Sequence, residues 1–80
     1  MKIESKYTRQ QIEAMKMREI KRLGLPKYAI QFHGHGILSE RFENYVIDHI
    51  RSAWVEAKKS GKYHTYKLYQ DGTLIKSELF

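Results

Sequence analysis

The chain has 80 residues, of which 41% are hydrophobic and 30% are charged, and its formal net charge is +6. A chain of this size buries a little over ~60% of its unfolded surface, which suffices for one small core, and its composition is too apolar for a disordered segment. The absence of cysteine excludes disulfides and thiolate metal sites. No apolar run approaches the ~18 residues of a membrane span, and MKIESKY lacks the apolar segment of a signal peptide. We therefore expect a single domain over residues 1–80, cytoplasmic and without a membrane partner.

The positive charge is concentrated in the first third of the chain. Residues 1–27 hold eight Lys and Arg against three Glu, a net of +5, whereas residues 28–80 hold seven Lys and Arg against six acids, a net of +1. Such asymmetry indicates an acidic partner for the first segment, which could be nucleic acid, an anionic membrane or an acidic protein surface. The membrane is the least favoured of the three, because the apolar residues Ile12, Met15, Ile20 and Leu23 include no aromatic anchor.

The first predicted element is a helix from Thr8 to Leu23, preceded by an extended or frayed lead-in over residues 1–7. Thr8 and Gln11 have the spacing of a capping box, and Gly24 follows as the residue that ends the helix. One side of this helix is apolar and the other is basic. The apolar side consists of Ile12, Met15, Ile20 and Leu23.

A short strand and a long helix are predicted next. Residues 28–33, YAIQFH, alternate between two faces as a half-buried strand does. The longest stretch with a helical period runs from Ser39 to Ser60, with Ser39 as its N-cap and Gly61 after its end. The apolar face of this second helix consists of Phe42, Val46, Ile50, Ala53, Trp54 and Ala57.

The clearest local signal is a β-hairpin at the C-terminus. Asp71-Gly72 separates KYHTYKLYQ from TLIKSELF, which is typical of a two-residue type I′ turn. The register set by this turn places Lys67 opposite Lys76 on an outer face. The aromatic residues of that outer face are Tyr63, Tyr69 and Phe80.

The predicted order is therefore α-β-α-β-β, an α+β fold with two helices packed on a small three-stranded sheet. A winged helix is the alternative, because a long helix followed by a hairpin resembles its C-terminal half. It would need a further short helix between Gly24 and Leu38, where the pattern predicts a strand instead.

The basic face of the first helix is the leading functional feature. Lys and Arg that project from one surface contact phosphates and release counterions, although such a face can also serve only to keep a protein soluble. We predict a small, non-catalytic nucleic-acid-binding protein whose phosphate contacts extend from this helix to the hairpin, with DNA and RNA both open as partners. The candidate residues are Lys16, Arg18, Lys21, Arg22, Lys27, Lys67, Tyr69 and Lys76.

The alternative function is a compact protein-binding module, an inhibitor or adaptor that docks on an acidic surface of another protein. The aromatic residues of the hairpin would be its anchors, because Tyr is enriched among interface hot spots. These anchors are Tyr63, Tyr69 and Phe80.

The histidines do not predict a metal site. His33 and His35 are spaced as paired ligands on a strand, but zinc requires three or four ligands and no second paired motif exists. We therefore predict neither a metal nor a cofactor. No acid–base or nucleophile set with supporting spacing can be assembled either, so we do not expect an enzyme.

Overall fold

The computed structural model describes residues 5–80, which form three helices and one four-stranded sheet. In chain order the elements are α1 (Arg9–Ala14), α2 (Met17–Leu23), β1 (Tyr28–Gly34), β2 (Ser39–Asn44), α3 (Ile47–Ser60), β3 (Tyr63–Gln70) and β4 (Thr73–Leu79). The α+β class and the C-terminal hairpin are confirmed, with one helix and one strand more than predicted. Residues 1–4 of the predicted lead-in lie outside the described residues. No helix in residues 5–80 is long and apolar enough to cross a membrane.

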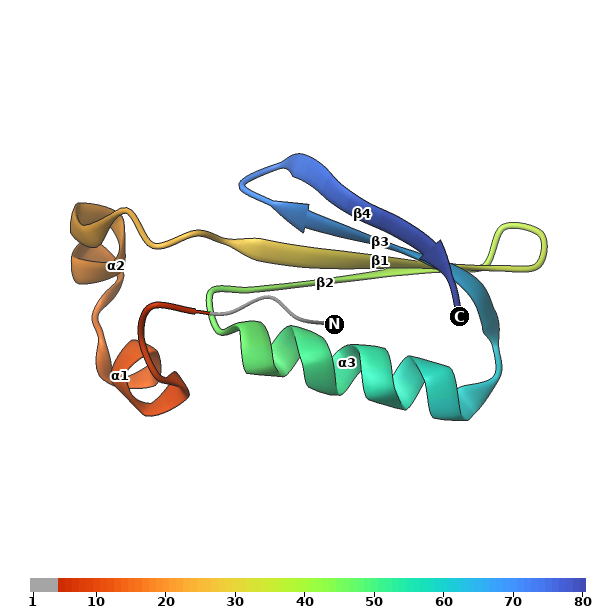
Figure 1. Ribbon diagram of the computed structural model, residues 1–80, viewed down its shortest axis with the longest axis horizontal. Helices are drawn as coiled ribbons and strands as arrows, with labels where there is room; N and C mark the ends of the chain where they lie inside the picture. The colour runs from red at the N-terminus through yellow and green to blue at the C-terminus, as the bar shows by residue number, and fades with distance from the viewer. Residues whose placement is uncertain (1–4) are drawn as a thin grey trace.

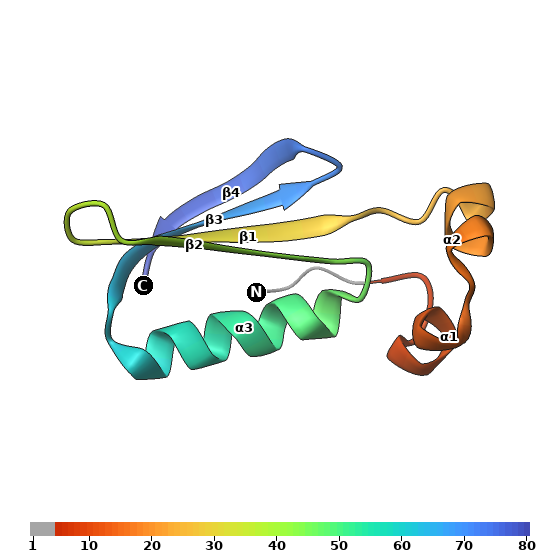
Figure 2. The same ribbon diagram turned by 180° about the vertical axis from the view of Figure 1, so that it is seen from behind.

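The sheet has the order β2-β1-β3-β4, and every neighbouring pair is antiparallel. Because β2 and β3 both run antiparallel to β1, they are parallel to each other, and α3 joins them as a split β-α-β unit. Figure 1 shows α3 running along one face of the sheet, with α2 beyond the strand ends. The β1–β2 loop lies at the other end of the molecule, which is 40 Å long and 22 by 19 Å across (Figure 2).

The main core lies between α3 and the sheet, and the predicted alternation of β1 and β3 places it there. Ile30 of β1 pairs with Leu68 of β3, and both are fully buried. Trp54 of α3 packs at the margin of this core and is only partly buried, less than its place on the predicted apolar face suggests. The buried members of the main core are Tyr28, Ile30, Phe32, Ile47, Ile50, Ala57, Tyr66 and Leu68.

The prediction of a helix from Ser39 is wrong for its first part, because residues Ser39–Asn44 form the edge strand β2. The aromatic ring of Phe42, which fits a helical stripe, fits equally well opposite Ile30 on the core side of the sheet. The backbone hydrogen bonds to β1 decide between the two. The strand β1 also occupies the segment in which a winged helix would need its extra helix, so that alternative is wrong.

The helix α3 begins at Ile47, not after Ser39 as predicted. The side chain that holds the turn leading into it belongs to Asn44. The side-chain oxygen of Asn44 accepts a hydrogen bond from the backbone N–H of Val46, at 2.8 Å. Val46 is the N-cap, and it makes no side-chain capping bond of its own. A local turn therefore separates strand from helix within three residues.

The first predicted helix is divided into α1 and α2. The capping box of Thr8 and Gln11 and the left-handed Gly24 are confirmed, but Met15 and Lys16 have extended backbone, with ψ of 142° and 153°. In a straight helix, residues eight apart lie about 12 Å apart along the axis. The break folds the chain so that two of them, Ile12 and Ile20, are buried together against Val46; we call these three residues the satellite core.

The hairpin turn is confirmed, but its strands contain a bulge. Asp71 and Gly72 have φ of 51° and 80°, as a type I′ turn requires. Beyond the first pairs the register shifts, so that Leu68 lies opposite Lys76 and Ile75 is the extra residue. The bulge moves Lys76 to the core side of the sheet.

The predicted outer face of the hairpin is wrong in three positions: this bulge moves Lys76 and Phe80, and a separate register shift between β1 and β3, next to Gly34, moves Tyr63. Lys67 lies opposite Ser77, not opposite Lys76, so two like charges are kept apart. Tyr63 and Phe80 also lie on the core side, with ring centroids 5.3 Å and 5.9 Å from that of Phe32.

Candidate functional site

One face of the sheet is covered by α3, and within residues 5–80 no helix covers the other. We call this second surface the open face. The strand registers place on it Ser39, Arg41 and Glu43 of β2, Ala29, Gln31 and His33 of β1, Thr65, Lys67 and Tyr69 of β3, and Leu74, Ser77 and Leu79 of β4. It is mainly polar, and its cations outnumber its acids.

The side chain of Arg41 on the open face is held by two contacts. Its Nε atom lies 3.0 Å from Oε1 of Glu43, and its guanidinium carbon lies 4.9 Å from the centroid of the Tyr69 ring. A cation over an aromatic face is electrostatically favourable. Within residues 5–80 its two terminal nitrogens make no hydrogen bond, so their N–H groups are available to a ligand.

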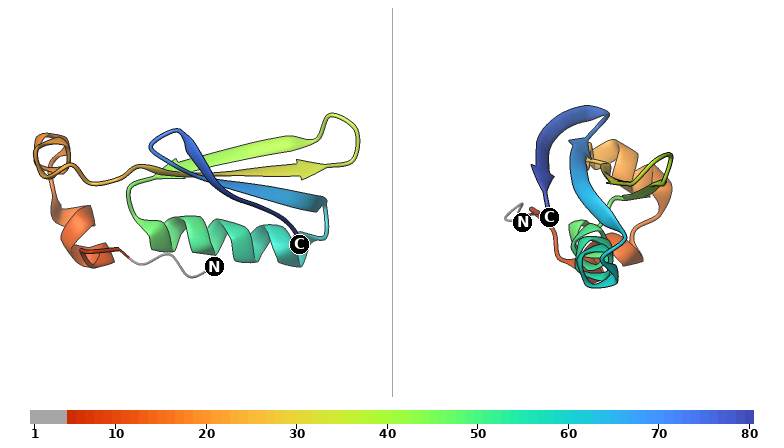
Figure 3. Two further views of the ribbon diagram at one scale, coloured as in Figure 1. Left: turned by 45° about the horizontal axis from the view of Figure 1, so that its top comes forward. Right: turned by 90° about the vertical axis from the view of Figure 1, so that its right-hand side faces the viewer.

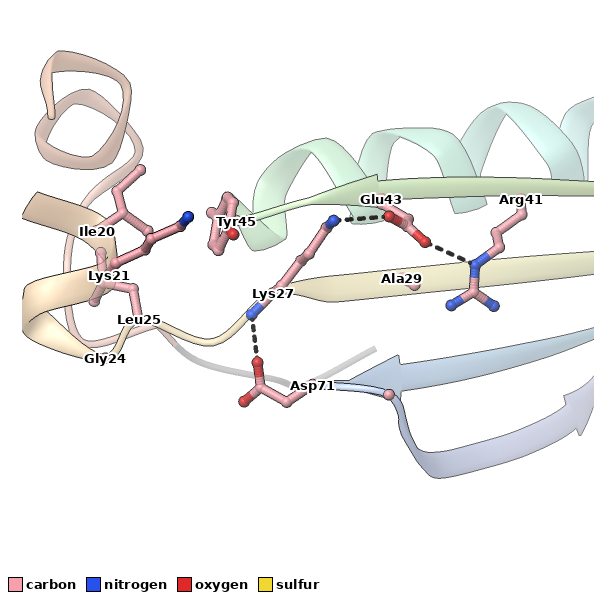
Figure 4. A pocket seen from close by; sticks show the side chains of 11 residues that line it. Ile20, Lys21, Gly24, Leu25, Lys27, Ala29, Arg41, Glu43, Tyr45 and Asp71 are labelled. Atoms are coloured by element: carbon pink, nitrogen blue, oxygen red, sulfur yellow. Dashed lines mark hydrogen bonds and ion pairs between the residues drawn. The ribbon is translucent and has the colours of Figure 1, made fainter. Parts of the chain in front are cut away.

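A pocket of about 560 Å³ opens where α2 meets the open face. Figure 4 shows Glu43 between two cations, with Lys27 on one side and Arg41 on the other, while Lys21 projects from α2 toward Tyr45. Lys27 Nζ lies 2.9 Å from Glu43 Oε2. The pocket thus joins α2 and the sheet in one electropositive hollow.

The charges in this pocket stabilise one another. The hydrogen bond from Lys27, and then that from Arg41, holds the pKa of Glu43 below its ordinary value. The same bond to Glu43 raises the pKa of Lys27. The backbone N–H of Lys27 also donates to Oδ1 of Asp71 at 3.0 Å, which ties the hairpin turn to the segment before β1.

The helix α2 supplies positive charge that has no partner in the described part of the chain. It carries a single acid, Glu19, and its cations make no ion pair with any of residues 5–80. All of these cations are exposed. They are Lys16 at the N-cap and Arg18, Lys21 and Arg22 within the helix.

Most of the predicted phosphate-binding residues therefore lie at one end of the molecule or on the open face. Lys21 and Lys27 meet in the pocket, and Lys67 and Tyr69 share the open face with Arg41. Lys76 does not join them: it lies on the core side, with Nζ 3.6 Å from Glu78 Oε2.

Sequence reasoning missed Arg41, because it placed this residue on a helix. The signal that could have found it is the alternation of Ser39, Arg41 and Glu43 with Glu40 and Phe42. Alternation of this kind is weak in an edge strand, where both faces can be exposed.

Two of the three predicted protein-binding anchors belong to the core. The ring of Tyr63 packs on Phe32, and that of Phe80 lies 5.1 Å from Tyr66. Only Tyr69 faces outward, and Arg41 covers part of its ring.

Three of the four histidines, His33, His35 and His64, lie near the β1–β2 loop, whereas His49 lies in α3. Both ring nitrogens of His64 have partners: Nδ1 lies 2.6 Å from Thr65 Oγ1, and Nε2 lies 2.9 Å from the carbonyl oxygen of Gly34. The ring of His35 packs against His64 at 5.4 Å. Across residues 5–80, no three His, Cys, Asp or Glu are grouped so that they could hold a metal ion.

No protein-family model matches the sequence, and the comparisons with curated proteins and with solved structures gave no match.

Proposed function

We propose that this chain is a small, non-catalytic nucleic-acid-binding protein that holds single-stranded DNA or RNA along its open face. The observation that supports this most directly is the pocket in which Lys21 of α2 meets Lys27 and Arg41 of the sheet region. It makes the unpaired charge of α2 and the open face one continuous surface. The expected cytoplasmic location is part of the same proposal.

The electrostatic part of the binding would come from α2 and its neighbours. A cation that already has an acidic partner gains less from a phosphate than one that has none, since the existing partner must be given up. The cations Lys16, Arg18, Lys21 and Arg22 have no such partner within residues 5–80. Neutralising phosphates with them would release counterions and make the affinity fall steeply with salt.

The open face would contact the bases. Unpaired bases stack on aromatic rings and on guanidinium groups, and the pair formed by Tyr69 and Arg41 offers both. Gln31 and His33 of β1 add hydrogen-bonding groups beside them. A duplex hides the faces of its bases, so this arrangement favours a single strand.

The test measures binding of fluorescent single-stranded and duplex oligonucleotides by anisotropy, at about 50 and about 200 mM salt. We expect the single strand to bind more tightly. The variant Arg18→Gln/Lys21→Gln/Arg22→Gln should bind more weakly, and its slope of log K against log salt should fall by about 0.7 for each phosphate that the variant no longer neutralises. These side chains are exposed, so the fold should be retained.

A matched control removes the same charge elsewhere. Lys58→Gln/Lys59→Gln/Lys62→Gln also lowers the net charge by three, at the far end of α3, and should bind almost as wild type does. If both triple variants lose equal affinity, binding depends on net charge alone and the proposed site is wrong. If wild type binds neither oligonucleotide, and a nuclease-treated extract yields a protein partner that Tyr69→Ala releases, the protein-binding alternative replaces the proposal.

A further inference from the structure

The outermost strand β4 exposes an unusual amount of apolar surface for the edge of a sheet. Leu74, Ile75 and Leu79 are 48%, 45% and 75% exposed. Figure 3 shows β4 and β2 as the two edges of the sheet. Proteins normally protect such edges, because an open strand can pair with another chain. On β4 only Lys76, Glu78 and the bulge could have this role.

We infer that β4 pairs with β4 of a second copy of this chain, antiparallel and about a two-fold axis at Ser77. Two identical surfaces can meet in this way only if they complement themselves. With the axis at Ser77, Lys76 lies opposite Glu78 of the partner subunit, and Ile75 lies opposite Leu79 of the partner subunit. Each pair occurs twice, and both kinds are favourable cross-strand pairs.

Charge selects this register over its neighbours. A two-fold axis perpendicular to the sheet keeps each side chain on its own face. Because residues opposite each other in an antiparallel pair point to the same face, the axis must lie midway between the two copies of one residue. An axis at Lys76 would place two lysines opposite each other, and an axis at Glu78 would place two carboxylates there, both of which are unfavourable. The axis at Ser77 alternates the charges across the interface instead.

The positions of Lys76 and Glu78 within one chain suit this pairing. Lys76 and Glu78 point to the same side of the sheet, with their charged groups 3.6 Å apart. The hydroxyl of Tyr66 donates to Oε2 of Glu78 at 3.1 Å, which limits the freedom of the carboxylate. The bulge at Ile75 lies at the end of the paired segment and leaves Lys76 to Leu79 regular.

The other edge is a weaker candidate. The large apolar side chain that β2 exposes is Phe42, and its ring packs on Phe32 with the centroids 5.9 Å apart. Pairing through β2 would therefore bury less free apolar surface than pairing through β4.

Such a dimer would contain one continuous sheet of eight strands, twice the four of a single chain. Because the axis is perpendicular to the sheet, both open faces would lie on the same side and both α3 helices on the other. The two α2 helices would lie at opposite ends. This inference holds whether or not the open face binds nucleic acid.

The test is sedimentation equilibrium of the full chain from about 10 µM to about 1 mM, with circular dichroism to verify folding. Wild type should show a monomer–dimer equilibrium in this range. Lys76→Glu places like charges opposite each other twice and should weaken dimerisation about tenfold or more. Adding Glu78→Lys to Lys76→Glu reverses both charges, restores the opposite pairs and should return most of the affinity.

Two further variants test the apolar contact. Leu79→Lys should abolish the dimer without unfolding the chain, since this side chain is 75% exposed. The matched control, Ile37→Lys, changes an even more exposed apolar residue in the β1–β2 loop and should leave the dimer intact. A chain that stays monomeric throughout, or a dimer that is insensitive to Lys76→Glu and Leu79→Lys, would overturn the inference.

Discussion

The guanidinium carbon of Arg41 lies 4.9 Å from the centre of the Tyr69 ring, although their strands, β2 and β3, do not pair with each other. The strand β1 runs between them, and its residue Ala29 pairs with Tyr69 on one side and with Glu43, two residues from Arg41, on the other; Ala29 is 5% exposed. A larger side chain at this position would separate the two groups. Three strands thus cooperate to hold one cation above one ring.

The first prediction concerns this pair. Tyr69→Ala should weaken binding of a single-stranded oligonucleotide about tenfold, because base–aromatic stacking contributes roughly 1–3 kcal/mol per base. The melting temperature should change little, since Tyr69 lies outside the main core. Tyr63→Ala provides the contrast: it removes a ring packed on Phe32 and should lower stability while the folded fraction binds normally. Equal binding losses in both variants would contradict a specific role for Tyr69.

The second prediction concerns Gly34 at the end of β1. A Cβ atom at this position would lie 2.6 Å from the carbonyl oxygen of Lys62 and 2.7 Å from Cδ2 of Leu38. The first of these atoms is backbone and cannot move aside easily. Gly34→Ala should therefore lower the free energy of unfolding by about 1–3 kcal/mol, measured by urea denaturation. His35→Ala, an exposed neighbour, should stay within about 0.5 kcal/mol of wild type.

The third prediction concerns the hairpin turn. Gly72 has φ of 80°, a left-handed conformation that β-branched residues avoid. Gly72→Val should cost roughly 1–2 kcal/mol or more and lower the melting temperature, whereas Thr73→Val, one residue later in extended backbone, should not. Retention of the wild-type melting temperature in Gly72→Val would mean that the turn adjusts at no cost.

The fourth prediction is a pH dependence. Hydrogen bonds from Arg9 and then from His49 hold the pKa of Glu13 below its ordinary value of 4.5. A carboxyl whose pKa is lower when folded stabilises the fold above its unfolded pKa, and this contribution is lost as the pH falls through its folded pKa. The contact at 2.8 Å between Glu13 and His49 joins α1 to α3, so α1 should loosen in acid below about pH 4.5.

Chemical shifts of α1 followed by NMR between neutral and acidic pH would test this. Glu13→Gln should remove the acid-induced change in α1. Glu40→Gln alters an exposed carboxyl near the start of β2, next to the β1–β2 loop, and should leave that change as in wild type. Persistence of the acid effect in Glu13→Gln would assign it to another group.

The parts of the fold that the sequence predicts correctly are those decided by local chemistry. Asp71 and Gly72 tolerate left-handed backbone, so these two adjacent residues are enough to determine the hairpin turn. The capping box of Thr8 and Gln11 is similarly local. The alternation of YAIQFH succeeds because β1 is a central strand with one strongly buried face.

The parts that failed depend on contacts between distant segments. Phe42 has the right spacing for a helix, and only its pairing opposite Ile30 makes its segment a strand. The break at Met15 has no local signal either, since it follows from the need to bury Ile12 and Ile20 together. The prediction of the candidate site shows the same division. The cations of α2 were found because the charge is concentrated in one segment, whereas Arg41 was missed because its strand was predicted as a helix.

The small size of the satellite core has a kinetic consequence. Ile12, Ile20 and Val46 alone are buried there, separate from the main core that holds the sheet and α3. Free energies of local opening follow the apolar contacts that an element makes, so α1 and α2 should detach transiently while the sheet remains intact. While detached, α2 stays covalently attached to the sheet, and its cations can reach a larger volume of solution than they can from a rigid surface. A segment attached in this way can capture an approaching phosphate chain at longer range and draw it in as the helices dock again.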